Sequence, residues 1–290
     1  MVEIAGVISP IYTIHQYTEE IYKVICFKGN RTSEKVVLHD RSEDRHNDVK
    51  LDNNFSRARS MVLQYALCNP WEYFFTGTLD KAKFDRFDLD TFAARLMQFI
   101  RDKRKKYASK FQVLLVPEQH QDGAWHIHGL VHGLLETALA PFTPPAPRHL
   151  IEEGFLNWPD YMERFGFCSL APIRDFVATA FYITKYVSKD LSRRGGDLGK
   201  HLYFHSRPLC KAEKASEVYL YNPTLESYCT ADFDFCKTGM VEDATWYFPY
   251  QWDGSEIPNE QTLIPKAVND PLKDFQPWTI DPFAEQIRLF

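Results

Sequence analysis

The stretch LLVPEQHQDGAWHIHGLVHG, residues 114–133, constrains the fold of this chain more than any other. Two apolar runs flank a Gln-Asp-Gly sequence, a pattern that predicts a β-hairpin. In a strand, alternate side chains point to the same face. His126 and His128, separated by Ile127, are therefore expected to share one face, where both imidazoles can bind one ion.

The length of the hairpin loop decides whether a carboxylate joins the two histidines. A two-residue turn would place Glu118 opposite Ile127, on the wrong face. A three-residue loop, residues 121–123, places it opposite His126. Such loops commonly end in a glycine with positive φ, and Gly123 stands at that position. We therefore predict the three-residue loop and one site made of the carboxylate and both histidines.

One carboxylate and two imidazoles can hold a hard divalent cation and leave coordination positions free for a phosphate. The set favours magnesium or manganese over zinc, whose structural sites prefer closed sets of thiols and imidazoles. The alternative is a polar stripe on the surface of the strand. His120 and His132 share the parity of the pair, and each can support the site, contact DNA or lie on the surface.

A second pattern lies in RDFVATAFYITKYVSKDL, residues 174–191, which predicts a helix. Tyr182, Lys185, Tyr186 and Lys189 fall at i, i+3, i+4 and i+7, on one face. Because apolar residues occupy the other sides, we expect the helix to present its tyrosines on a polar face. A phenol can form a covalent intermediate once its proton is removed, and neighbouring ammonium groups favour the phenolate. The alternative is a solvated surface with cation–π contacts.

The other segments predict an α+β fold, in which helices pack against one antiparallel sheet. An inserted loop is expected over residues 134–157, which contain the proline-rich sequence PFTPPAP, and Asp88 or Asp90 is expected to cap a helix. Beyond residue 200 we expect a mostly irregular chain. The expected elements are a hairpin over 11–28 and 35–40, helices over 52–68 and 89–107, and strands over 71–79, 165–173 and 202–207.

The net charge is −5, but the acidic excess lies at one end. Of 34 Lys and Arg and 39 Asp and Glu, residues 201–290 hold 7 and 14, which leaves 27 and 25 for the first 200 residues. A weakly charged core can still bind DNA through a local patch. The basic run at the end of the helix over 89–107 can instead complement the helix dipole. The candidate DNA contacts are Lys103, Arg104, Lys106, Arg193 and Arg194.

Several classes of protein do not fit the sequence. We expect no membrane span and no signal peptide. The six cysteines are scattered, which fits reduced thiols in a cytoplasm. The sequence GGDLGK lacks the spacing of a P-loop, so we expect no nucleotide cofactor and no helicase within the chain.

Three motifs together resemble those of the HUH endonucleases, in particular the rolling-circle replication initiator (Rep) proteins of phages and plasmids. FFTGTLD (74–80) resembles the first motif of that family, WHIHGLVHG (125–133) the His-hydrophobic-His motif, and YITKYVSKD (182–190) the tyrosine motif. LYFHSR (202–207) is similar to a segment that follows in phage-type initiators. The motifs cover roughly residues 70–207 and stand in the order of the family.

The resemblance implies an HUH fold of the RRM/ferredoxin-like kind, with the histidines on a central strand of a five-stranded antiparallel sheet flanked by helices. It implies a nickase domain over residues 70–207, an N-terminal extension over 1–69 packed on that core, and an acidic C-terminal extension over 208–290 with no catalytic domain of its own. The implied metal ligands are His126, His128 and Glu118.

The implied activity is nicking of single-stranded origin DNA by a tyrosine that becomes linked to the new 5′ end, followed by strand transfer that reseals the circle. Tyr186, assisted by Lys189, matches the single-tyrosine pattern, and Tyr182 with Lys185 adds the second tyrosine of the paired pattern. The implied partners are origin DNA and a host helicase and polymerase, in the cytoplasm of a bacterial cell. Two alternatives stay open: an HUH transposase or relaxase, and a non-catalytic, metal-stabilised DNA-binding module.

Overall fold

The computed structural model describes residues 11–28, 43–107, 110–189, 202–219, 221–232 and 236–242. The chain divides into two compact units, one of Val37–Lys211 and one of Met1–Val36 together with Ala212–Phe290. The predicted boundaries at residues 69 and 207 differ from this division. The long helix α1 (Glu43–Leu67) belongs to the same unit as the histidine strand, while the described strands near the two ends of the chain share the other unit.

The unit that carries the histidines is built on a seven-stranded sheet in the order β6-β7-β8-β3-β5-β4-β9. Every pairing in it is antiparallel. The histidine strand β5 lies between β3 and β4, so its backbone is bonded on both sides. The strands are β3 (Tyr73–Thr78), β4 (Gln112–Gln119), β5 (Trp125–His132), β6 (Ala140–Pro141), β7 (Leu156–Asn157), β8 (Cys168–Pro172) and β9 (Phe204–His205).

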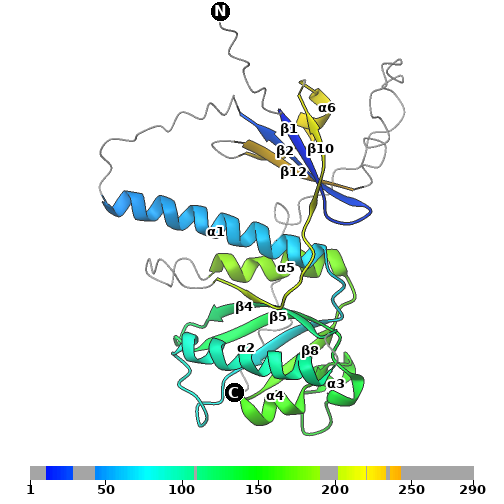
Figure 1. Ribbon diagram of the computed structural model, residues 1–290. Helices are drawn as coiled ribbons and strands as arrows, with labels where there is room; N and C mark the ends of the chain where they lie inside the picture. Colours follow the sequence, from blue (N-terminus) through cyan, green and yellow to red (C-terminus); the bar gives the residue numbers. More distant parts are fainter. Residues whose placement is uncertain are drawn as a thin grey trace, which may run out of the picture. The chain divides into compact units, whose positions relative to one another are not determined.

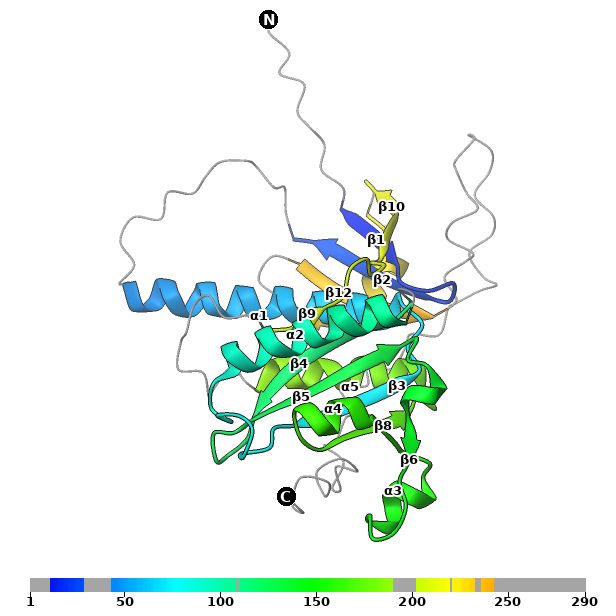
Figure 2. The same cartoon turned by 60° about the horizontal axis from the view of Figure 1, so that its bottom comes forward.

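Helices cover both faces of this sheet (Figures 1 and 2). Helix α2 (Leu89–Lys106) buries its apolar side chains, spaced three and four apart, against the odd-numbered positions of β4 and β5, such as Leu115 and Ile127. Helix α5 (Phe176–Lys189) packs on the even-numbered positions, and α1 runs alongside it. As expected, Asp88 caps α2: its carboxylate accepts a hydrogen bond from the backbone N–H of Thr91.

The hairpin of β4 and β5 has the predicted register. Glu118 pairs with His126, and Val116 pairs with His128. Gly123 has a φ of +87°, a conformation that side chains other than glycine rarely adopt. The prediction of a three-residue loop that ends at this glycine is therefore confirmed.

The central sheet is not the expected five-stranded one. Residues 134–157, expected to form a loop, contribute a 3₁₀ turn η1 (Glu136–Ala138), β6, α3 (Arg148–Glu152) and β7. Because β6 and β7 pair with each other and β7 pairs with β8, the insertion extends the sheet at one edge. Helix α4 (Pro159–Arg164), between β7 and β8, was also not foreseen.

The second unit contains a five-stranded antiparallel sheet in the order β10-β1-β2-β12-β11. This corrects the expectation that the chain beyond residue 200 is mostly irregular. Strand β2 pairs with β1 and β12, and the other half of the predicted hairpin, 35–40, lies outside the described residues. The elements are β1 (Tyr12–Gln16), β2 (Ile21–Phe27), β10 (Glu213–Val218), α6 (Pro223–Ser227), β11 (Ala231–Asp232) and β12 (Cys236–Glu242).

A search of the helices within the described ranges found none that is both long and apolar enough to cross a membrane.

Two glycines with the same backbone conformation provide a test of how the histidine strand ends. Gly133, just after β5, and Gly154, after α3, both have a φ of +74°. A Cβ at Gly133 would lie 2.5 Å from the carbonyl oxygen of Lys110, whereas a Cβ at Gly154 would have no atom within 4 Å. We expect Gly154→Ala to lower the free energy of unfolding by about 1–2 kcal/mol through backbone strain alone.

Gly133→Ala should lower it further, by about 2–4 kcal/mol in all, because the backbone must also move. Urea denaturation followed by circular dichroism measures both changes. Equal losses for the two variants would show that the contact with Lys110 does not constrain the strand.

Candidate functional site

Three neighbouring strands bring polar side chains together on the α5 face of the sheet. The Nε2 atom of His128, on β5, lies 2.9 Å from Oε2 of Glu118, on β4. The Nδ1 atom of the same ring lies 3.3 Å from the hydroxyl of Thr76, on β3, the residue that pairs with it across the strands. Both ring nitrogens of this buried histidine therefore have polar partners.

Helix α5 places a tyrosine directly on this histidine. The ring of Tyr186 stacks on that of His128, with centroids 3.8 Å apart and planes inclined by 17°. The hydroxyl of Tyr186 donates a hydrogen bond of 2.6 Å to the hydroxyl of Tyr182, one turn earlier. Phe74, on β3, meets the ring of Tyr182 edge-on at 5.4 Å. The two tyrosines predicted from the YxxK spacing thus lie over the His-Glu pair.

The tyrosines face the sheet and not the solvent, which corrects the expectation that the helix presents them on a polar face. Tyr186 is only 1% exposed, and Tyr182 is half-buried. The expectation was wrong because it assumed one buried and one solvated side for the helix. Since α1 packs along α5 on another side, apolar residues there do not identify the side that meets the sheet.

The basic residues expected near the tyrosines are only partly within the described structure. The ammonium group of Lys185 lies 4.8 Å from the ring centroid of Tyr182, a cation–π contact. Lys189 ends α5, but its side chain lies outside the described residues, as do Arg193 and Arg194. Their predicted roles stay predictions.

His126 occupies a less polar position than its neighbour. Its ring stacks on that of His120, with centroids 3.8 Å apart. Burial is the largest of the causes that lower the pKa of His126 to about 3, and the charges of His120 and His128 add to it. Its Nδ1 atom is buried with no hydrogen-bond partner among the described residues. At neutral pH this side chain is an uncharged imidazole, the form in which histidine binds metals.

Whether these side chains fit a metal ion can be judged from their chemistry. As the described side chains stand, no group of three or more His, Cys, Asp or Glu is placed to hold an ion. The direct contact between His128 and Glu118 occupies two of the atoms that would bind one. The donor set still fits a divalent cation, because the Nδ1 atom of His126 is buried without a polar partner in the described chain and a carboxylate lies next to the second imidazole.

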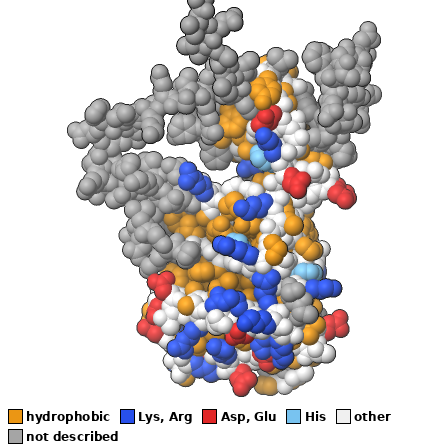
Figure 3. Space-filling model, in the orientation of Figure 1, with side chains coloured by type: hydrophobic (Ala, Val, Ile, Leu, Met, Phe, Trp, Pro, Cys, Tyr) orange, Lys and Arg blue, Asp and Glu red, His pale blue; other side chains and the backbone are white. Residues whose placement is uncertain are grey.

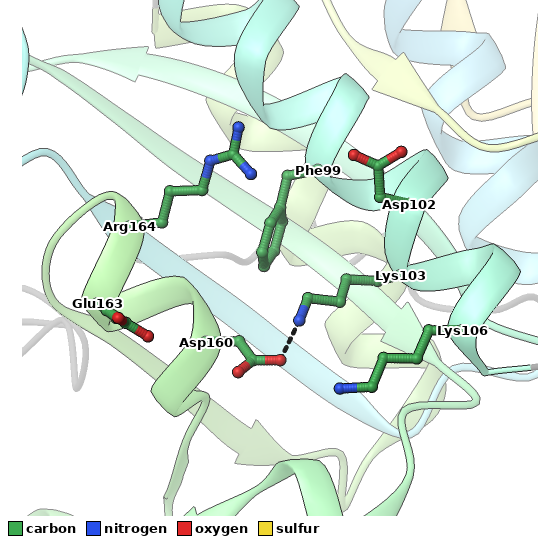
Figure 4. Close-up of a pocket in the computed structure, with 7 residues that line it drawn as sticks. All are labelled: Phe99, Asp102, Lys103, Lys106, Asp160, Glu163 and Arg164. Carbon is green, nitrogen blue, oxygen red and sulfur yellow. Dashed lines mark hydrogen bonds and ion pairs between the residues drawn. The ribbon is translucent and has the colours of Figure 1, made fainter.

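The basic run at the end of α2 lies on the other face of the sheet from the histidines. Lys and Arg side chains gather over α2 and α4 (Figure 3). There Lys103 forms an ion pair with Asp160 at a pocket of about 510 Å³ between the two helices (Figure 4). Lys106 lines the same pocket, and Arg104 follows Lys103 on α2. The sheet separates these three residues from the tyrosines, so any contact they make with DNA would be remote from the reacting phosphate.

Sequence reasoning missed two features of the site. One is the contact of Thr76 with His128, although the resemblance pointed to hydroxyl residues on this strand; the pairing register, which needs the β3–β5 neighbourhood, decides it. The other is Arg86, whose guanidinium pairs with Asp122 of the hairpin turn at 2.9 Å and whose charge helps to lower the pKa of His126. Nothing in the local sequence indicated that this loop reaches the site.

The comparison with protein families bears on all these elements at once. Residues 72–191 match the family of replication-associated proteins described as ORF2 and gene II protein, and this segment spans β3, α2, the β4–β5 hairpin, β8 and α5. The chain carries a replication-associated domain of this family. Membership of the family indicates a role in the initiation of replication and implies DNA binding. No curated protein and no solved structure matches the chain.

The buried position of His126 predicts how the stability of this replication-associated domain depends on pH. The unfolded imidazole binds a proton below about pH 6.5, whereas the folded one resists protonation down to about pH 3. Its contribution to stability is therefore complete above the first value and is lost as the pH falls towards the second. With chelator present, the unfolding free energy of the wild type should fall more steeply than that of His126→Gln, by about 1.4 kcal/mol per pH unit.

Urea denaturation at several pH values within this window measures the two slopes. Parallel curves for the wild type and the variant would contradict a neutral, buried His126.

Proposed function

We propose that the domain is a metal-dependent endonuclease of the HUH kind, which initiates rolling-circle replication by nicking single-stranded origin DNA and later rejoins the ends. One observation carries the proposal: the ring of Tyr186 lies on His128, whose Nε2 contacts Glu118. A nucleophile, a ligand-type imidazole and a carboxylate are thus brought together by three elements far apart in sequence. The family match to replication-associated proteins supports the same activity.

In the proposed reaction the phenol oxygen of Tyr186 attacks the phosphorus of one phosphodiester. The new Tyr–O–P bond forms as the bond from phosphorus to the 3′ oxygen breaks, and the leaving oxygen takes up a proton to become a 3′-OH. The DNA 5′ end is then held as a phosphotyrosine. Attack by a 3′-OH on this linkage reverses the step, which rejoins a strand and frees the tyrosine.

The hydrogen bond between the two tyrosines suits them to work together. In the structure Tyr186 donates to Tyr182. When Tyr186 loses its proton, the hydroxyl of Tyr182 can turn and donate to the phenolate, since a phenol both donates and accepts. The ammonium of Lys185, over the ring of Tyr182, adds positive charge next to the pair. Tyr186 is the proposed first nucleophile, and Tyr182 its helper or a second nucleophile.

His126, His128 and Glu118 are the proposed ligands of Mg²⁺ or Mn²⁺. A bound divalent ion supplies Lewis acidity, which polarises a phosphate and offsets the charge that develops on its oxygens. The chain itself contributes orientation: the β3–β5 pairing holds the Thr76 hydroxyl at the second nitrogen of His128. Because that hydroxyl can donate or accept, it can hold either tautomer of the ring.

The proposed partners are single-stranded origin DNA and a helicase and polymerase of a bacterial host, with the reaction in the cytoplasm. A transposase or relaxase with the same chemistry would form the same kind of adduct on other DNA. A metal-stabilised binding module would bind DNA and form no adduct. These rivals are outcomes of the test below.

The wild type should form a covalent adduct with one labelled single strand from a set that tiles the DNA of its own replicon. The adduct should require manganese or magnesium, disappear with chelator, and survive a denaturing gel. Tyr186→Phe should reduce the rate of adduct formation by about a thousandfold or more, because no other group replaces a nucleophile. Tyr182→Phe should reduce it less. A denaturing gel with phosphorimaging gives the rates.

Tyr161→Phe is a matched control, since this buried tyrosine packs on the α2 face of the sheet. Adduct loss only in the double variant Tyr182→Phe/Tyr186→Phe would show that either tyrosine can act. Tight binding of a strand without any adduct would overturn the proposal in favour of the binding module.

Thr76 and Thr78 allow a matched test of support for the metal site. Both stand on β3, but the hydroxyl of Thr76 contacts His128, whereas that of Thr78 donates to the backbone carbonyl of Phe167. Thr76→Val should raise the manganese concentration needed for half-maximal adduct formation by about 10–100-fold, the usual effect of losing a group that orients a metal-binding histidine. Thr78→Val should leave it unchanged. Equal shifts for both variants would contradict the role of Thr76.

A further inference from the structure

Phe87 is an aromatic side chain that the fold holds out into solvent. It is 62% exposed, on the loop between β3 and α2. Single exposed apolar residues are common on protein surfaces and need no explanation by themselves. What sets this one apart is how its backbone is fixed and what lies beside it.

The backbone of Phe87 is tied to two rigid elements. Its N–H donates to the carboxylate of Asp85, at the turn that leads into α2, and its carbonyl accepts a hydrogen bond of 3.1 Å from the indole N–H of Trp125, on β5. The backbone N–H of Trp125 in turn donates to the carbonyl of Arg86, at 2.9 Å. The loop therefore continues along β5 where β3 has ended, and Phe87 cannot withdraw without breaking these bonds.

The ring of Phe87 lies against the tip of the metal-site hairpin. A Cβ built on Gly123 would be 3.4 Å from two of its ring atoms, so the ring packs on the bare backbone of this glycine. Gly123 is three residues from His126, roughly 10 Å along the strand. Next to Phe87, the guanidinium of Arg86 is held by Asp122 of the same turn. An aromatic face and a cation thus stand together at the end of the strand pair that carries Glu118 and the histidines.

Other surface features carry less. The pocket between α2 and α4 is lined by three cations and three carboxylates, which leaves no net charge to attract an anion. Leu135, an exposed apolar residue of the same unit, follows the opposite end of β5. Tyr219 and Tyr221 are exposed as well, but they belong to the other unit.

We propose that Phe87 is a positioning residue that stacks on one unpaired base of single-stranded DNA next to the scissile phosphate, with Arg86 contacting the neighbouring backbone phosphate. Aromatic stacking platforms beside cations are the general means by which proteins hold unpaired strands. The stacked base would fix the register of the strand, and hence which phosphate meets Tyr186. This inference deepens the proposed nickase function and rests on it for the identity of the ligand.

An abasic scan tests the stacking. Binding of fluorescently labelled single strands that each lack one base is measured by anisotropy, with chelator present so that no cleavage occurs. For the wild type, loss of the stacked base should weaken binding by about tenfold, as expected for one aromatic-base stack. In Phe87→Ala the complete strand should bind about tenfold more weakly, and the abasic penalty at that one position should vanish.

Phe87→Trp should keep both the affinity and the penalty, because indole also stacks. Leu135→Ala, the matched control at the far end of β5, should behave as the wild type. Arg86→Gln should make the dependence of log K on log salt shallower by about 0.7, the value for one phosphate contact of a single strand. A penalty that persists at every position in Phe87→Ala, or an equal loss on all strands, would overturn the proposal, as would failure of the wild type to bind single strands.

The readout separates this inference from the nickase proposal. A penalty that depends on Phe87 in a protein that forms no adduct would uphold the stacking and reject the nickase. An adduct with no position-specific penalty would do the reverse.

Discussion

The alternation of side chains along β5 is the constraint on which the domain depends. Odd positions such as Ile127 join the core under α2, and even positions carry His126 and His128 towards α5. Because neighbouring strands on both sides bond β5, the strand cannot slip by one residue without exchanging core and site. The apolar core thereby fixes the direction of both imidazoles, and the hydrophobic burial that stabilises the sheet also holds the site.

The second consequence of this constraint is that the site is assembled in layers. The His128 ring meets Thr76 and Glu118 at its edge, through hydrogen-bonding distances, and Tyr186 at its face, through stacking. Each contact uses a different part of the ring, so none excludes the others. The family match covers the elements that supply all four side chains, and this is where replication-associated function and packing coincide.

Much of the site could be predicted because its geometry is local. Glu118 and His126 lie across a tight hairpin, so loop length and one positive-φ glycine were enough to set their pairing. The spacing of Tyr182 and Tyr186 on one helix turn followed from helical periodicity. The side of α5 that meets the sheet could not be predicted, since α1 adds a packing surface that the helix sequence does not reveal. The strand pairs supplied by residues 134–157 and by both ends of the chain also escaped, because short strands carry little periodicity.

The sequence by itself determined the α+β class, the hairpin, its register and the residues that carry the chemistry, because each depends on contacts between residues close in the chain. Only the tertiary structure decided that Tyr186 stacks on His128 and that Thr76 braces it. It also placed the basic run of α2 on the other face of the sheet from the tyrosines, and brought Phe87 to the tip of the hairpin. These relations join residues many positions apart, and their geometry depends on the order of strands and on which helix covers which face. Neither follows from local periodicity.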